Sequence, residues 1–352
     1  SSFFIYFHYI VCNWFGNMMI SQFEVTPYSV PFLSPWQTAR GTYTHREGIW
    51  LKLQWQGFVG NGEAAPLQNI SRENLKEIHY ALDEFHKVIE DENYGLEELQ
   101  LLIEVHTQDL PSARFALETA VFDSLAQESN KSLAEYLNPH YKSQIAVNGI
   151  AGLHQPSDGF NVIKVKMGFH NLFDEIENME YLTQTYGDIV QFRLDLNAAL
   201  DLPKAIRFCK EMEKFNIDYI EQPLAKDNLE DLAELRYHTT IPIAVDESLT
   251  DYPSAEKLIE MQAADVFIIK PMISGGFTEC SKIIELAKSR NIRAVITTSL
   301  ETSIGRSACI HLAAANEIIE PCGLATEGLL IEDCDKIPIK EGNVSISKMH
   351  GL

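Results

Sequence analysis

Three acidic residues follow apolar runs in the second half of the chain, at nearly equal intervals. They are Asp195 in RLDLN, Glu221 in YIEQP and Asp246 in AVDES; Glu221 follows Asp195 by 26 residues, and Asp246 follows Glu221 by 25. Carboxylates that converge in a buried site repel one another unless a cation neutralises them, and oxygen ligands suit Mg2+. The spacing therefore predicts a divalent metal site. The competing interpretation is that each acid only caps the helix that follows it.

Three lysines occupy comparable positions. Lys164 and Lys166 are two residues apart in VIKVKMG, so a strand directs both side chains to the same face. Lys270 ends the apolar run DVFIIKP. A lysine near a metal and other cations can lose its proton at a workable pH, which suits a base that acts on a carbon acid. The alternative of solvated surface lysines does not explain why a charge ends an apolar run in both segments.

The elements that carry these residues alternate in type. After Ser143, short apolar segments are separated by helical stretches, which is the rhythm of parallel βαβ units. The apolar segments are NVIKVKMG, VQFRLDLN, IDYIEQP, IPIAVDES, DVFIIKP and IRAVITTSLE. Because no glycine-rich dinucleotide fingerprint accompanies them, the pattern favours a closed barrel, although periodicity alone leaves a doubly wound sheet open. A barrel would gather the polar strand ends at its C-terminal mouth.

The first part of the chain has a different pattern. Residues 23–67 read as strands bounded by Pro and Gly, and residues 72–126 have a helical period, clearest in SARFALETAVFDSLAQ. A chain of 352 residues exceeds the usual size of one compact domain. An α+β segment followed by an α/β segment therefore predicts two domains, with a boundary near residues 138–143.

Composition limits the partners and the compartment. Fifty acidic and 28 basic residues give a net charge of -22, which opposes binding to nucleic acid or an anionic membrane. The six cysteines form no CxxC pair, which fits reduced thiols better than a disulfide framework or a zinc site. The apolar run 3–15 is shorter than the roughly 20 residues of a spanning helix. We expect a cytoplasmic protein with no nucleic-acid or membrane partner.

Residues 1–18 are expected to be an upstream or non-native extension, because ordinary strand-like alternation begins only after Met18 and Met19. The run also lacks the basic flank and the small-residue cleavage site of a signal peptide. A buried N-terminal segment is the alternative.

The motifs KVK, LDLN, IEQP, VDES and IIKPMISGG, in this order and spacing, resemble the enolase superfamily and its muconate-lactonizing subgroup. The resemblance spans about residues 19–331. It implies an α/β fold: a (β/α)7β TIM-like barrel at 139–331, an N-terminal α+β capping domain at 19–138, and a C-terminal segment, 332–352, that packs back on the capping domain.

The same resemblance implies roles for individual residues. Lys166 would be the acid/base on one face of the substrate and Lys270 would stand on the other, with Lys164 and Asn197 in support. The cofactor would be Mg2+, with Mn2+ as a substitute, and its ligands would be Asp195, Glu221 and Asp246. A substrate carboxylate bound to the metal has a more acidic α-hydrogen, and the metal stabilises the charge that develops.

Three segments resemble the o-succinylbenzoate synthase family within this subgroup: TARGTYTHREGIWLKL with GNGEAAPL, SARFALETAVFDSLAQ, and TSLETSIGR. They imply substrate contacts from Arg40, Ser299 and Glu301. The implied reaction is the syn-dehydration of 2-succinyl-6-hydroxy-2,4-cyclohexadiene-1-carboxylate, a small anionic carboxylate, to o-succinylbenzoate in menaquinone biosynthesis.

The competing interpretation is a dipeptide epimerase or an N-acylamino acid racemase of the same superfamily. Dipeptide epimerases normally hold the substrate ammonium with an Asp-x-Asp pair after the last barrel strand, where this chain reads PCGLATEGLL. An anionic substrate without an amine is therefore expected. A monomer and a homo-oligomer both remain open.

Overall fold

The computed structural model describes residues 19–38, 41–68, 70–90, 92–187, 189–331, 337–346 and 351–352. The interpretation of residues 1–18 as an extension lies outside these residues, as does the substrate contact expected from Arg40.

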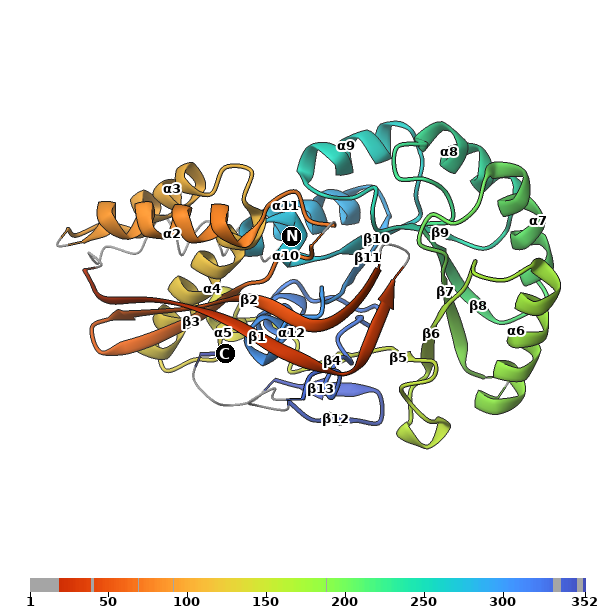
Figure 1. Cartoon of the computed structure of the whole chain (residues 1–352), viewed down its shortest axis with the longest axis horizontal. Coiled ribbons are helices and arrows are strands. Elements are labelled where there is room, and N and C mark those ends of the chain that lie inside the picture. The colour runs from red at the N-terminus through yellow and green to blue at the C-terminus, as the bar shows by residue number, and fades with distance from the viewer. Residues whose placement is uncertain are drawn as a thin grey trace.

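An antiparallel sheet with helices beside it forms the N-terminal region. Its strands are ordered β1-β2-β3, with bounds Ile20–Thr38, Gly41–Trp55 and Phe58–Ala64. In β2 the apolar residues Ile49, Leu51, Leu53 and Trp55 are buried and Lys52 between them is exposed, as expected for a sheet covered on one face. Figure 1 shows the sheet beside helices whose bounds are α2 Leu75–Ile89, α3 Leu96–His106, α4 Pro111–Glu128 and α5 Leu133–Leu137.

Helix α4 packs so closely on β3 that the strand needs glycine. A Cβ on Gly62 would overlap the backbone carbonyl of Ala116, and one on Gly60 would overlap that of Ala120. Backbone atoms of a buried helix cannot move aside as the end of a flexible side chain can. The SARFALETAVFDSLAQ segment is therefore almost entirely buried, between this sheet and the second domain.

Gly62→Ala is expected to lower the free energy of unfolding by about 1–3 kcal/mol or more, the usual cost of overpacking a core. Urea unfolding followed by circular dichroism would measure it. Gly95→Ala is the control, because a Cβ there meets only the Glu98 carboxylate at 3.6 Å, an ordinary contact. Equal stability of the two variants would show that the sheet and α4 separate at little cost.

The second region is a curled parallel sheet with helices outside it (Figure 1). Its seven strands have the order β11-β10-β9-β8-β7-β6-β5. Their bounds are β5 Gly149–Ile150, β6 Val162–Lys166, β7 Gln191–Asp195, β8 Ile217–Glu221, β9 Ile243–Val245, β10 Val266–Ile269 and β11 Arg293–Ile296. The helices are α6 Leu172–Tyr186, α7 Leu202–Met212, α8 Leu229–His238, α9 Tyr252–Glu260, α10 Pro271–Ser274, α11 Gly276–Ser289 and α12 Ser303–Ala315, and a short 3-10 helix, η1, spans Pro156–Asp158.

This arrangement confirms the predicted α/β architecture with an N-terminal α+β domain. The two edges of the sheet approach each other through Cys322 and Gly323, which form isolated parallel bridges with Val147 and Thr297. The described residues contain no regular eighth strand at this seam, so the closed barrel stays a prediction.

The C-terminal residues contact both regions. Strands β12 (Ile339–Lys340) and β13 (Asn343–Ser345) form a small sheet with β4 (Gln144–Ala146). Further on, the carbonyl of Gly351 accepts from Leu133 N–H, and the Leu352 N–H donates to Asp123 on α4 at 2.9 Å.

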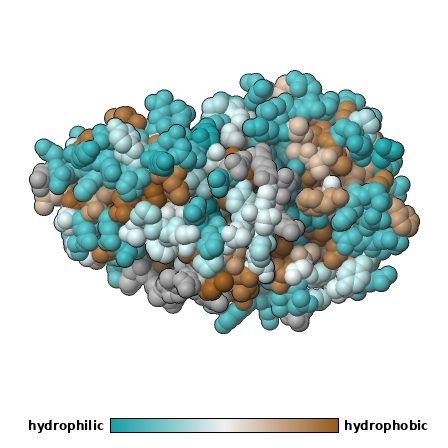
Figure 2. All heavy atoms as spheres, in the orientation of Figure 1, coloured by the Kyte–Doolittle hydropathy of each residue, from teal (hydrophilic) through white to brown (hydrophobic). Residues whose placement is uncertain are grey.

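The surface in Figure 2 is largely hydrophilic, with scattered apolar residues. Among the described residues, no helix combines the length and the apolar character needed to cross a bilayer.

Candidate active site

The strand register brings the predicted site residues side by side. Lys166 at the end of β6 pairs with Asp195 at the end of β7, and Asp195 pairs with Glu221 at the end of β8. Asp246 follows β9 and Lys270 follows β10. Parallel strands that are adjacent and in register place their C-terminal ends at one edge. The spacing of about 25 residues seen in the sequence is therefore one βα unit.

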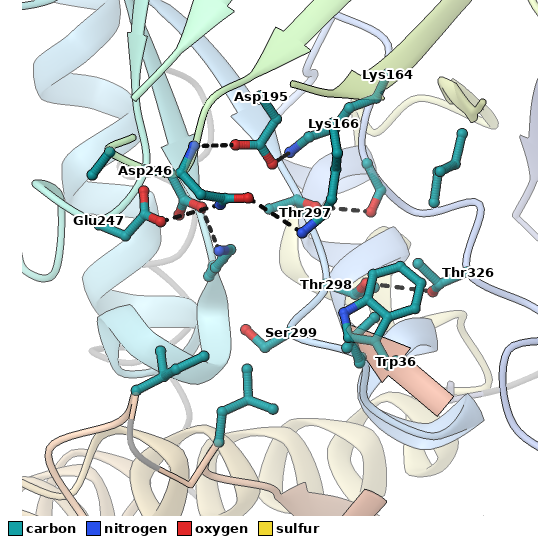
Figure 3. Close-up of a pocket in the computed structure, with 18 of the residues that line it drawn as sticks. Trp36, Lys164, Lys166, Asp195, Asp246, Glu247, Thr297, Thr298, Ser299 and Thr326 are labelled. Atoms are coloured by element: carbon teal, nitrogen blue, oxygen red, sulfur yellow. Dashed lines mark hydrogen bonds and ion pairs between the residues drawn. The ribbon is translucent and has the colours of Figure 1, made fainter. Parts of the chain in front are cut away.

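Lys166, Asp195, Asp246 and Lys270 line a cavity of about 370 Å³ between the two domains, and Glu221 is not among the described residues that line it. Figure 3 shows the carboxylates and lysines on one side and Ser299 and Trp36 on another. The N-terminal domain contributes mainly apolar and aromatic side chains, and the segments after β11 contribute hydroxyls. The N-terminal residues are Trp36, Tyr43, Leu67 and Ile70, and the later segments supply Thr297, Thr298, Ser299, Leu300, Gly323, Ala325 and Thr326.

Two lysines lie between the carboxylates. The Lys164 ammonium is 3.0 Å from the Asp195 carboxylate and 2.8 Å from Glu221, and the Lys270 ammonium is 2.5 Å from Asp246. Burial opposes the charge of Lys164, but Asp195 and Glu221 outweigh it and raise its pKa well above the usual value. For Lys270, burial is likewise outweighed by Asp246 and Glu247, and its pKa is raised. Both therefore remain cationic in this arrangement.

Lys166 has the opposite tendency. Burial lowers its pKa, and the nearby charges of Lys164 and Lys270 act in the same direction. Its ammonium donates to the Asn197 side-chain oxygen at 3.3 Å and lies 5.6 Å from the centre of the Trp36 ring. A lysine that loses its proton more readily is suited to act as a general base.

As the side chains stand, the described residues contain no cluster of three or more His, Cys, Asp or Glu arranged to hold a metal ion. The lysine ion pairs occupy the space between the acids. Two carboxylate oxygens, Oε2 of Glu221 and Oε2 of Glu247, are nevertheless buried with no hydrogen-bond partner among the described residues. Burial, followed by repulsion from Asp195, raises the pKa of Glu221 to about 8.

These acids fit a hard divalent cation, which would neutralise the repulsion and engage the unpartnered oxygens. Asp195, Glu221 and Asp246 are the residues that would hold it. Their assignment as ligands stays a prediction, and Glu247 belongs to the same acidic group although the sequence analysis did not single it out. Its position directly after Asp246 was the available signal.

Gln222 is a second residue that the sequence analysis missed. It is fully buried, and its side-chain oxygen accepts from the backbone N–H of Asp246 at 3.0 Å and of Ser248 at 3.2 Å. Its nitrogen donates to Ser248 Oγ at 2.9 Å. Gln222 therefore fixes the strand end that carries Asp246.

The predicted substrate contacts lie at different depths. Ser299 lines the cavity, and its hydroxyl is buried with no hydrogen-bond partner among the described residues. Glu301 is not among the described residues that line the cavity; its carboxylate accepts from Ser299 N–H at 2.8 and 2.7 Å. The structure thus places Glu301 behind the wall that carries Ser299. Both assignments as substrate contacts stay predictions.

Comparisons with known proteins agree with this architecture. Residues 22–137 match the model for the mandelate racemase / muconate lactonizing enzyme N-terminal domain, and residues 153–352 match the enolase C-terminal domain-like model. The chain is 25% identical to the L-Ala-D/L-Glu epimerase of Bacillus subtilis in a substrate-liganded structure, with a TM-score of 0.87 over 95% of this chain and 98% of that one. A dipeptide epimerase from Enterococcus faecalis, solved with Mg and L-Leu-L-Tyr, has a TM-score of 0.84 at 24% identity, covering 95% of this chain and 99% of that one.

Curated relatives include several activities. The Bacillus subtilis epimerase is 27% identical over 86% of this chain and 87% of its own length, and an N-succinyl-L-Arg/Lys racemase of Bacillus cereus is 22% identical over 86% of each. An o-succinylbenzoate synthase of Thermobifida fusca is 31% identical over 55% of this chain and 63% of its own length. Relatives with epimerase or racemase activity match over the longer span. The two domain models together cover nearly the whole described chain, and the protein therefore belongs to the enolase superfamily, as a member of its mandelate racemase / muconate lactonizing enzyme family.

Proposed function

We propose that the protein is a Mg2+-dependent enzyme that removes the proton α to the carboxylate of a small anionic substrate, and that the reaction is the dehydration catalysed by o-succinylbenzoate synthases. The reaction class is supported by a cavity in which a carboxylate cluster lies beside Lys166, a lysine whose pKa is lowered by burial. A solved relative complexed with Mg and the dipeptide L-Leu-L-Tyr supports the same cofactor.

The choice of substrate rests on where the acids of the cavity lie. Among the described residues that line it, the acids are Asp195, Asp246 and Glu247, all in the cluster proposed to face the metal. The wall formed by residues 297–300 and 323–326 presents hydroxyls, backbone and apolar groups. A substrate ammonium would therefore meet no carboxylate of its own, and a buried unpaired charge is costly. A substrate that carries carboxylates but no amine fits this cavity.

In the proposed dehydration, Lys166 removes the hydrogen from the ring carbon that bears the carboxylate. The electron pair of that C–H bond forms the new ring double bond as the C–O bond to the neighbouring hydroxyl breaks. Lys166, now protonated, returns the proton to the departing hydroxide on the same face, which yields water and the aromatic product. Lys270 remains cationic beside Asp246 and stabilises developing negative charge. When bound, Mg2+ supplies Lewis-acid stabilisation of the substrate carboxylate.

Racemisation of N-succinylamino acids is the second candidate. The B. cereus racemase matches this chain over 86% of its length, more than the o-succinylbenzoate synthase does. Lys166 and Lys270 extend from strands four positions apart in the sheet, so each could serve one face of an α-carbon. An N-succinylamino acid shares a carboxylate and a succinyl arm with the cyclohexadiene substrate, and acylation removes the charge of its α-amino group.

A comparison of substrates tests this assignment. We expect L-Ala-L-Glu to have a kcat/KM at least ~100-fold below that of the cyclohexadiene carboxylate, because an unpaired buried charge costs about 3 kcal/mol. Loss of diene absorbance measures dehydration, and α-deuterium exchange in D2O measures epimerisation. N-succinyl-L-alanine tests the racemase activity. N-acetyl-L-Ala-L-Glu and L-Ala-L-Glu form the matched pair for the ammonium, because acetylation removes its charge and keeps both carboxylates.

Each outcome of this assay selects one activity. Efficient exchange of N-succinyl-L-alanine with slow dehydration would replace the synthase assignment by the racemase. Faster turnover of L-Ala-L-Glu than of both the cyclohexadiene carboxylate and N-succinyl-L-alanine would contradict the inference that the cavity has no partner for a substrate ammonium.

A further inference from the structure

Arg46 on β2 is 2% exposed and lies outside the set of described residues that line the cavity. An arginine has five N–H donors in a fixed fork, and here all five are used on backbone carbonyls. Nε donates to the carbonyl of Leu300 at 2.9 Å. Nη1 donates to the carbonyls of Glu47 at 3.0 Å and Pro66 at 3.1 Å. Nη2 donates to the carbonyl of Ser299 at 3.2 Å and, in a shorter contact, to that of Ala65.

The acceptors belong to two walls of the cavity. Ser299 and Leu300 line it directly from the second domain, and Pro66 precedes Leu67, which lines it from the N-terminal domain. One guanidinium thus ties both walls together. The segments are far apart in sequence, since Arg46 and Leu300 are separated by 254 positions.

The turn that Arg46 holds is strained. Leu300 has a φ of 64°, in the left-handed region that a branched, non-glycine residue adopts only when its surroundings impose it. Arg46 fixes the carbonyls of this turn from one side, and the Glu301 carboxylate fixes the Ser299 N–H from the other. The Ser299 hydroxyl has no hydrogen-bond partner among the described residues, and Figure 3 shows it at the cavity.

We propose that Arg46 is a positioning residue that holds the two cavity walls in register and aims the Ser299 hydroxyl at a hydrogen-bond acceptor of the substrate, such as the carboxylate of a succinyl arm. This inference rests on the proposed function in taking the substrate to be a small carboxylate in this cavity. Arg46 does not touch the substrate. Its loss should therefore weaken substrate binding and leave the lysines and the acids in place.

Arg46→Lys and Arg46→Met test this role. Lysine keeps the charge, but its three donors radiate from a single nitrogen and cannot span carbonyls on two walls. Methionine fills similar space and donates nothing. We expect both variants to raise KM by at least ~10-fold, corresponding to loss of a hydrogen bond of about 1.4 kcal/mol or more, with kcat changed less than about threefold.

Hydrogen–deuterium exchange supplies a readout that needs no substrate. Amide exchange across residues 297–303 should accelerate in both Arg46 variants, at a temperature well below unfolding. Arg114→Met is the matched control, because this arginine of the N-terminal domain is partly buried, pairs with Glu118 at 3.0 Å and is not among the described cavity residues. It should leave KM and the exchange of 297–303 unchanged.

Lower thermal stability in Arg46→Met with unchanged KM and unchanged exchange at 297–303 would reduce Arg46 to a structural residue and overturn the proposal. If Arg46→Met does not fold, Arg46→Lys carries both measurements. Absence of turnover by the wild-type enzyme on every carboxylate tested would reject the proposed function alone, because the exchange measurement still decides the role of Arg46.

Discussion

Lys166→Ala is expected to reduce turnover to background. In the proposed dehydration Lys166 both removes the α-proton and protonates the departing hydroxide, and each acid/base role is typically worth ~10²–10⁴-fold. The position cannot be filled by its neighbour, since Lys164 is held between Asp195 and Glu221 with a raised pKa. Steady-state kcat, together with the incorporation of solvent deuterium into recovered substrate, measures the loss of both proton transfers.

Lys226→Ala is the control for this experiment, because Lys226 also lines the cavity but its side chain is exposed. Its replacement should cost less than about tenfold. Lys270→Arg keeps the positive charge with a different shape and should retain part of the dehydration if that lysine acts electrostatically. Activity that survives in Lys166→Ala but is lost in Lys270→Arg would reverse the faces assigned to the two lysines.

Chelation with excess EDTA should abolish turnover, and Glu221→Gln should weaken Mg2+ binding and activity together. Glu221 is 1% exposed at the end of β8, and one of its carboxylate oxygens has no hydrogen-bond partner among the described residues. The neutral amide would remove a negative charge and one oxygen ligand while keeping the size of the side chain. Calorimetric titration with Mg2+ gives the affinity without any need for turnover.

A thermal shift supports the same measurement, since a cation that binds only the folded state stabilises it by mass action. Mg2+ should raise the Tm of the wild-type protein but not that of Glu221→Gln. Glu118→Gln is the control, because Glu118 is also a buried acid but belongs to helix α4, where it pairs with Arg114. Full activity in EDTA, or an unchanged Mg2+ affinity in Glu221→Gln, would remove Glu221 from the metal site.

Much of the site could be predicted from the sequence. Asp195 and Glu221 end β7 and β8, and Asp246 directly follows β9. Lys164 and Lys166 lie on β6, and Lys270 directly follows β10. These residues meet because adjacent parallel strands place their C-terminal ends at one edge of the sheet. The motifs that carry the charges are short and local. The N-terminal sheet and the helix SARFALETAVFDSLAQ could be predicted for the same reason, since alternation and helical period are read within a few residues.

The substrate, unlike the acids and lysines of the site, could not be predicted from the sequence motifs. The relatives include an epimerase, a racemase and an o-succinylbenzoate synthase, so membership of the family does not identify the substrate. The absence of an Asp-x-Asp pair in PCGLATEGLL was a local signal, but its meaning depends on which side chains face the cavity. In the structure, Gly323, Ala325 and Thr326 of this stretch line the cavity.

The sequence by itself determined the fold class, the strand-end acids and the lysines, because each depends on period, spacing and residue type within a short stretch. Only the tertiary structure shows which buried polar side chains hold the strand ends and the cavity walls in place by hydrogen bonds. Gln222 holds Asp246 across two strands, and Arg46 ties Ser299 and Leu300 to the N-terminal domain. Arginine and glutamine in an ordinary strand or loop give no signal of such contacts. Their partners are backbone atoms, which every residue carries, and in the case of Arg46 and Leu300 they lie 254 positions away in the chain.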